Sequence, residues 1–228
     1  MYQAQHETGK PAYHLEFDIS QNSVTRLKQQ ALEFKSQLTG WCSERKACIL
    51  IDLILKSKAK KIVEIGVYGG QSLVPMACAL KALGQGVVYG IDPWDNVAAL
   101  ERVMNADNKN YWATVPLSQI MQDLIQKIPE FNLENQIVLI KNTSAETPPI
   151  EEIDILHIDG NHSEVTSFPD VLKWVPLVKS GGYIIFDDMT WYENGTFTTA
   201  KAVEWLNTHC IKFAEFRDNC DWGIWIKP

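Results

Sequence analysis

The sequence lacks the features of a membrane-spanning, secreted or disulfide-stabilised protein. No apolar run reaches the roughly 18 residues that a transmembrane helix needs. The N-terminal segment 1–18 is polar and has no apolar stretch of the signal-peptide kind. The cysteines are five, an odd number, and none forms a CxxC pair, so neither a disulfide framework nor a zinc site is indicated. We therefore expect reduced thiols, a cytoplasmic location and no membrane partner.

Basic clusters, repeats and low-complexity segments are also missing. The formal net charge is −7 and no block of Lys or Arg occurs, so nucleic acid is not an expected partner. Hydrophobic residues make up 46% of the chain, which is enough for a packed core and argues against disorder. The length of 228 residues suits one α/β domain. The oligomeric state stays open, with a homodimer as one alternative.

Short apolar runs alternate with helical patterns along most of the chain. The runs are rich in Val and Ile and fall at 61–65, 87–91, 136–140, 154–158 and 183–186. Apolar residues on both faces are typical of parallel strands covered by helices on each side. Helical patterns fall at 44–56, 71–83, 164–175 and 198–208. The alternation predicts an α/β fold with a Rossmann-like, doubly wound sheet.

Two segments depart from this alternation. Residues 93–133 are too long for an ordinary crossover, and such insertions are often lids or substrate-binding loops. Near the end of the chain, 211–216 and 222–226 predict an antiparallel hairpin, which makes seven strands in all. We expect one domain over 1–228, with 1–43 as an N-terminal helical cap and 93–133 as the insertion.

The first predicted strand ends in a glycine-rich turn that contains a carboxylate. Residues 64–70 read Glu-Ile-Gly-Val-Tyr-Gly-Gly. Glycines allow a ligand to approach the backbone, and the next helix offers free N–H groups. In the dinucleotide fingerprint a glycine stands where this chain has Glu64, and a carboxylate there would repel a pyrophosphate. The turn thus favours a ligand with a cationic or amino group. A turn that only joins strand to helix is the alternative.

The second predicted strand ends at Asp92. An acidic residue about 20–30 positions after a glycine turn, at the end of the next strand, suits the hydroxyls of a ribose. Taken alone, Asp92 could equally be a helix cap. Together with Glu64 and the glycine turn, the ribose interpretation is favoured.

The E-I-G-x-x-x-G turn followed by G-I-D resembles the first two motifs of class I S-adenosylmethionine-dependent methyltransferases. A hairpin that closes a mostly parallel sheet is also typical of that family. The resemblance implies contacts with each part of the cofactor: Gly66, Tyr68 and Gly70 with the methionine, Asp92 with the ribose, and Trp94, Ser144 and Ala145 with the adenine. Glu64, Ser72 and Asp159 complete the predicted cofactor-binding set.

Carboxylates end two further predicted strands. One strand ends at Asp159, and the next ends at Asp187 and Asp188. Because ligands bind at the carboxyl ends of parallel strands, we expect these three side chains at one rim, beside the cofactor. Three uncompensated carboxylates repel one another and favour a cation such as Mg²⁺, or another divalent ion. The alternative is a helix cap and solvated side chains. His157 lies inside the strand and is expected to be a buried partner.

The I-D-G-x-H and G-G-Y-I-I-F-D-D segments resemble metal-dependent small-molecule O-methyltransferases of the catechol and macrolide-sugar types. Asp188 stands where the catechol type often has Asn. His162 lies three residues after Asp159, where the resemblance implies the general base. A histidine is a natural proton acceptor near neutral pH. The alternative is a structural loop histidine.

These observations predict Mg²⁺-dependent methylation of a hydroxyl on a small molecule, with S-adenosylmethionine as the methyl donor. Two alternatives stay open. One is a metal-independent N- or C-methyltransferase, and the other is a non-catalytic protein that binds S-adenosylmethionine. A dinucleotide oxidoreductase is disfavoured by Glu64.

Overall fold

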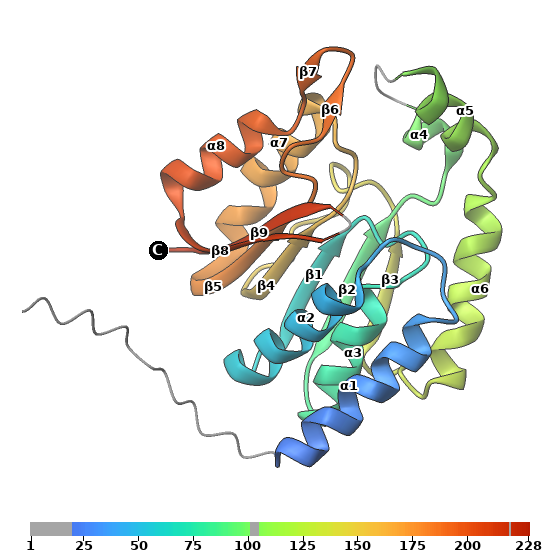
Figure 1. The fold of residues 1–228 in the computed structure, drawn as a ribbon, viewed down its shortest axis with the longest axis vertical. Coiled ribbons are helices and arrows are strands. Elements are labelled where there is room, and N and C mark those ends of the chain that lie inside the picture. Colours follow the sequence, from blue (N-terminus) through green and yellow to red (C-terminus); the bar gives the residue numbers. More distant parts are fainter. Residues whose placement is uncertain (1–19, 101–104, 219) are drawn as a thin grey trace, which may run out of the picture.

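The computed structural model describes residues 20–100, 105–218 and 220–228 of the chain (Figure 1). A seven-stranded sheet has the order β3-β2-β1-β4-β5-β9-β8. The strands are β1 Lys61–Ile65, β2 Val87–Asp92, β3 Ile137–Lys141, β4 Ile153–Ile158, β5 Val178–Phe186, β8 Ile211–Arg217 and β9 Asp221–Ile226. The first five are parallel to one another, and β9 pairs antiparallel with both β5 and β8.

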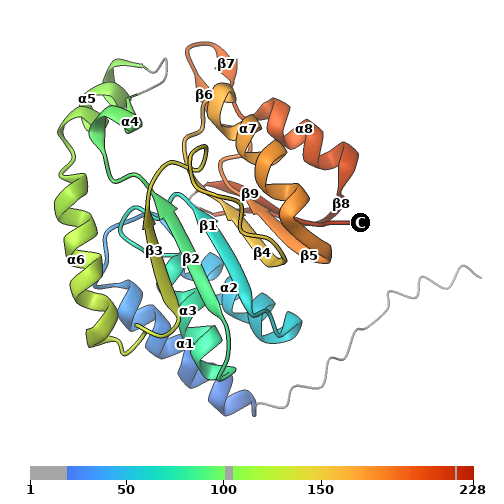
Figure 2. The same ribbon diagram turned by 180° about the vertical axis from the view of Figure 1, so that it is seen from behind.

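Helices cover both faces of this sheet. One face carries α1 (Gln21–Lys35), α2 (Glu44–Ser57) and α3 (Leu73–Ala82), and the other carries α7 (Glu164–Trp174) and α8 (Ala200–His209) (Figures 1 and 2). Alternate residues of β1 enter different cores, because Ile62 packs with the α1–α3 layer and Val63 packs with α7 and α8. The doubly wound architecture predicted from the sequence is confirmed.

The insertion at 93–133 contains three described helices. They are α4 (Asn96–Ala99), α5 (Ala106–Thr114) and α6 (Leu117–Glu130). The buried positions of α6 are Leu117, Ile120, Leu124 and Ile128, which recur at three to four residues and therefore form one apolar stripe. This stripe packs into the core on the α1–α3 side. The α4–α5 pair lies beyond the carboxyl ends of the strands, across from the small β6–β7 hairpin (Tyr192–Glu193 and Thr196–Phe197) (Figure 1).

The first turn of α2 places the Lys46 side chain at the carboxyl edge of the sheet. Ser43 caps this helix by accepting a hydrogen bond from the Lys46 N–H at 2.9 Å. Apolar residues at 47, 50, 51, 54 and 55 are buried, as expected for an amphipathic helix packed on a sheet. Lys46 belongs to the same buried side, in the first turn of the helix. Its side chain is thereby directed towards the ends of β4 and β5.

Within the part of the chain that the structure describes, no helix has the length and apolarity of a membrane span.

Candidate active site

A pocket of about 980 Å³ opens at the carboxyl ends of the parallel strands. This is the edge at which open α/β sheets bind ligands. Most of the residues predicted from sequence line it: Gly66, Tyr68, Ser72, Asp92, Ser144, Ala145, Asp159, His162, Asp187 and Asp188. Glu64, Gly70 and Trp94 are outside this lining. The residues predicted from sequence thus lie mostly along one pocket at this edge of the sheet.

The turn after β1 can be formed only with glycine at position 66. Gly66 has a φ of +85°, and a Cβ there would lie 2.2 Å from the carbonyl oxygen of Asp159. The backbones that follow β1 and β4 are thus in direct contact at the pocket edge. Gly70 has a φ of +86° and a Cβ would lie 2.7 Å from Leu124 of α6, so this glycine allows helix packing.

Asp92 holds the glycine turn against the end of β2. One carboxylate oxygen accepts the N–H groups of Val67 and Tyr68 at 3.0 and 2.9 Å, and the other accepts the N–H of Trp94 at 2.7 Å. Burial raises the pKa of Asp92, and these three backbone hydrogen bonds oppose that rise only in part. Asp92 is therefore a structural clamp as well as a pocket residue.

Trp94 requires a correction. The resemblance implied that its ring flanks the adenine, but the side chain is only 1% exposed and belongs to the hydrophobic core. Its φ is +43°, and its indole N–H donates to the Tyr68 carbonyl at 2.7 Å. The indole is consequently drawn beneath the glycine turn, away from the pocket.

Aromatic side chains form one wall of the pocket. The Trp41 ring stacks on Tyr68 with centroids 4.9 Å apart, and Trp112 meets Tyr68 edge-on. The Tyr68 and Tyr111 hydroxyls are 2.7 Å apart. Because Trp41 precedes α2 and Tyr111 lies on α5, the wall joins the N-terminal part of the chain to the insertion.

On another side of the pocket, Ser144 donates to Asp170 at 2.5 Å, and burial raises the pKa of Asp170 to about 6.

A buried charge cluster forms the floor between β1, β4 and β5. Glu64 and His157 are register partners on adjacent strands and hence point to the same face. Asp159 follows His157 by two residues, and Asp187 follows Ile185, the partner of His157 on β5, by two residues. The two-residue period of a strand directs all of them towards α2.

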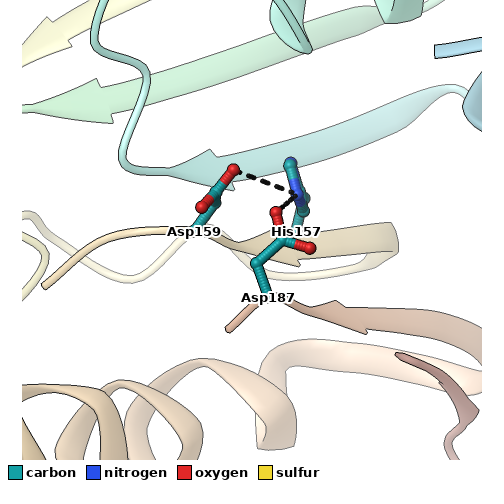
Figure 3. A group of neighbouring side chains, drawn as sticks. All are labelled: His157, Asp159 and Asp187. Atoms are coloured by element: carbon teal, nitrogen blue, oxygen red, sulfur yellow. Dashed lines mark hydrogen bonds and ion pairs between the residues drawn. The ribbon is translucent and has the colours of Figure 1, made fainter. Parts of the chain in front are cut away.

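His157 is the centre of this cluster. Its Nδ1 lies 2.8 Å from Glu64 Oε1, and its Nε2 lies 3.2 Å from Asp187 Oδ2. Figure 3 shows the imidazole facing the carboxylates of Asp159 and Asp187, with Nε2 3.8 Å from Asp159 Oδ2. Burial and the charge of Lys46 lower the pKa of His157, but hydrogen bonds to Asp187 and Glu64 prevail and raise it to about 9. The expectation that His157 is a buried partner is confirmed.

Glu64 serves this cluster rather than the pocket surface. It is 0% exposed, and its Oε1 also accepts a 2.5 Å hydrogen bond from Ser72. Oε2 has no hydrogen-bond partner among the described residues. Glu64 is thus buried outside the pocket lining, where it is held by Ser72 and His157.

Lys46 lines the pocket but was not predicted from the sequence. Its ammonium forms a short ion pair with Asp187 Oδ2 and lies 3.4 Å from Asp159 Oδ2. Burial lowers the pKa of Lys46, but the two carboxylates outweigh that effect and raise it well above its usual value. A lysine among the buried apolar positions of α2, four residues before Leu50, is the only sequence signal that could have revealed it.

The two neighbouring carboxylates respond in opposite ways. Burial and the charge of Asp187 raise the pKa of Asp159 well above its usual range. For Asp187, burial acts upward, but Lys46 and His157 lower the pKa below its usual range. Asp187 is therefore the ionised member of the pair, and both cations are directed at it.

His162 and Asp188 form a second pair on the outer side of the cluster. His162 Nε2 lies 2.9 Å from Asp188 Oδ2, although this contact does not have hydrogen-bond alignment. The imidazole also packs on Trp191 with centroids 4.5 Å apart. The side chain is 18% exposed, so it can be reached from the pocket.

The donor set has the chemistry of a divalent-cation site. Ligand atoms of Asp159, His162 and Asp188 lie within 4.8 Å of one another, as do those of His157, Asp159 and Asp187. Asp187 Oδ1 is buried and has no hydrogen-bond partner among the described residues. Carboxylate oxygens suit hard divalent ions. The carboxylates suit a divalent ion, but neither group contains both Asp187 and Asp188, and Lys46 contacts two of the three predicted ligands, Asp159 and Asp187.

Solved structures share this architecture along nearly the whole chain. An O-methyltransferase from Bacillus cereus in complex with SAH is 14% identical with a TM-score of 0.58, covering 92% of this chain and 93% of that chain. TomG from Streptomyces achromogenes, an O-methyltransferase solved with SAM, is 13% identical with a TM-score of 0.59, covering 92% and 91%. The O-methyltransferase NovP is 15% identical with a TM-score of 0.59, covering 88% and 79%. At these identities the likeness shows the fold.

A comparison by sequence gives the family. A search among curated proteins finds no match. A family model described as a methyltransferase domain matches residues 63–189, which is more than half of the chain and extends from β1 through the Asp187–Asp188 pair. This chain belongs to that methyltransferase-domain family.

Proposed function

We propose that the protein transfers a methyl group from S-adenosylmethionine to a hydroxyl of a small molecule. One observation carries this proposal. A single pocket is lined by the glycine turn and Asp92 as well as by Asp159, Asp188 and His162. The SAH and SAM complexes of the Bacillus and Streptomyces proteins support the choice of cofactor. S-adenosylmethionine supplies an electrophilic methyl group on a sulfonium.

The chain offers distinct groups to each part of this cofactor. Gly66 lines the pocket and is assigned to the methionine part. A carboxylate has about four acceptor positions, and Asp92 uses three of them on backbone N–H groups, which leaves one for a ribose hydroxyl. Ser144 and Ala145 line the region assigned to the adenine.

Replacement of Asp92 by Asn should weaken SAH binding by about 1–3 kcal/mol, because an amide NH₂ cannot accept hydrogen bonds. Calorimetry with SAH gives the difference, and wild type should show no binding of NAD⁺. Asp95→Asn is the matched control, since Asp95 also lines the pocket but caps α4 through the Ala98 N–H, which Asn does equally well. Tight NAD⁺ binding, or an unchanged SAH affinity in Asp92→Asn, would contradict the assignment.

The acceptor end of the pocket is assigned to the carboxylates. Asp159, Asp187 and Asp188 would hold a Mg²⁺ ion or another divalent cation. When bound, that ion would stabilise the alkoxide or phenolate form of the acceptor. Asp159 and Asp188 line the pocket from adjacent strand ends, so the acceptor oxygen would enter between them.

His162 is assigned as the base. Its Nε2 lies 2.9 Å from Asp188 Oδ2, and the ring would take the proton that the acceptor hydroxyl gives up. Trp191 packs on the ring and restricts its orientation. The oxygen left by the proton would form the new bond to the methyl carbon, as the bond from that carbon to sulfur breaks. The aromatic wall around Tyr68 would exclude water from this region.

One observation favours a metal-independent transfer as the second candidate. Lys46 already supplies a positive charge to Asp159 and Asp187, so the carboxylates do not depend on an ion for neutralisation. In that case the same pocket would position an acceptor with Asp188 and His162 alone.

Removal of divalent ions distinguishes these two candidates. SAH release is measured with a panel of phenols and sugars, after EDTA treatment and again after Mg²⁺ is restored. We expect the activity to fall by about 10²-fold or more without metal and to return with Mg²⁺, since charge stabilisation at a developing anion has this scale. Full activity in excess EDTA would contradict metal dependence and favour the second candidate.

A further inference from the structure

Lys46 brings an ammonium group into contact with the proposed metal ligands. It is 2% exposed, and its Nζ contacts Asp187 Oδ2 and Asp159 Oδ2. These are two of the three carboxylates assigned to the divalent ion. A buried charge is costly unless it is paired, and here one lysine is paired with two acids. The contact of Lys46 with these two carboxylates is therefore part of the packed protein interior.

An ammonium and a divalent ion would use the same oxygen atoms. Asp187 Oδ2 contacts Lys46 and also lies 3.2 Å from His157 Nε2, so that oxygen is already surrounded by positive charge. The other oxygen, Asp187 Oδ1, has no hydrogen-bond partner among the described residues. Two cations a few ångströms apart repel each other strongly in a partly buried site. A metal ion at Asp159 and Asp187 is incompatible with the present position of the Lys46 ammonium.

Lys46 has room to withdraw. Its side chain lines the 980 Å³ pocket, and a lysine stem is flexible. The Nζ is also 5.7 Å from the centre of the Trp222 ring, and the face of a tryptophan ring attracts a cation. The ammonium can thus leave the carboxylates and keep a favourable contact.

We propose that Lys46 is a resident counter-ion that competes with a divalent cation for Asp159 and Asp187, so that a metal binds only as the lysine side chain withdraws. This inference rests on the proposed metal-dependent function. Lys46 acts here as a positioning residue, because it holds the two carboxylates together in the absence of metal. Lys46 would also weaken the affinity of Asp159 and Asp187 for the metal, so that a higher concentration of free ion is needed to occupy the site.

Mn²⁺ binding to the SAH-saturated protein tests this inference directly. Free Mn²⁺ is measured by electron paramagnetic resonance for wild type, Lys46→Met and Lys46→Arg. Lys46→Met should bind Mn²⁺ about tenfold more tightly or better, the scale for removing one unit charge at this range. Lys46→Arg keeps the charge and should stay within about threefold of wild type by the same reasoning. Calorimetry with SAH verifies that each variant is folded.

Chemical labelling of the wild-type protein gives a second measurement that requires no variant. Reductive methylation followed by mass spectrometry should leave Lys46 unmodified in the metal-free protein, because it is buried and paired. Saturating Mn²⁺ should make Lys46 reactive towards the reagent. EDTA added to the Mn²⁺-loaded protein before labelling should make Lys46 unreactive again. Lys28, which pairs with Asp52 away from the pocket, is the internal control and should not respond to metal.

The outcomes separate the inference from the function on which it rests. Equal Mn²⁺ binding by wild type and Lys46→Met, or unchanged labelling of Lys46 at saturating Mn²⁺, would overturn the inference and leave metal dependence intact. Weaker binding by Lys46→Met would also overturn it, because the lysine would then support the metal. No Mn²⁺ binding by any of the proteins would overturn both the inference and the metal-dependent function.

Discussion

Asp187→Asn is expected to abolish methyl transfer and to lower the free energy of unfolding by about 3–5 kcal/mol, the scale for breaking a buried ion pair. Asp187 is the acid to which Lys46 and His157 are both directed. Loss of its charge leaves two buried cations without their main partner and removes a proposed metal ligand. Activity is measured as SAH release with the best acceptor from the panel, and stability by chemical unfolding.

A second variant separates the chemical effect from the folding effect. Asp187→Asn combined with Lys46→Met removes one charge of each sign, so the net burial of charge is close to that of wild type. We expect the double variant to recover part of the lost stability and none of the activity. Wild-type turnover in the single variant would refute the role of Asp187. Turnover regained in the double variant would show that the loss came from misfolding.

His162→Ala should lower kcat by about 10²–10⁴-fold, the usual cost of losing a positioned base. The imidazole contacts Asp188 and Trp191 at the rim of the pocket, outside the buried charge cluster. Binding of SAH should therefore stay close to wild type.

His209→Ala is the matched control for His162→Ala. His209 also packs on a tryptophan, Trp205, with ring centroids 4.2 Å apart, but it lies at the end of α8 and is absent from the pocket lining. Its replacement should leave kcat unchanged. A kcat near the wild-type value in His162→Ala, on the best acceptor, would mean that the proton leaves by another route and that the histidine is structural.

The sheet could be predicted from sequence because its strands are buried on both faces. The first four strands begin and end within one residue of the predicted apolar runs. The carboxyl ends of parallel strands converge by construction, so Asp92, Asp159 and Asp187 could be assigned to one edge. The start of β5 was less evident, because Lys179 and Ser180 interrupt the apolar pattern and the pairing with β4 shifts in register there.

Individual side chains were harder to place than strands. Lys46 is distant in sequence from every carboxylate that it contacts, and a single charged residue in an amphipathic helix is ordinarily solvated. Trp94 follows Asp92 closely, but its left-handed backbone turns the indole into the core. Both cases depend on tertiary packing, which local patterns of residue type do not record.

The clamp that Asp92 places on the glycine turn has a consequence for the kinetics of ligand capture. With the backbone of Val67, Tyr68 and Trp94 fixed by one carboxylate, the loop is ordered before any ligand arrives. The conformational entropy of this segment is lost when the protein folds, and no further loss is needed on association. Association therefore does not require closure of this loop. Differences in affinity among related ligands should arise mainly from their dissociation rates.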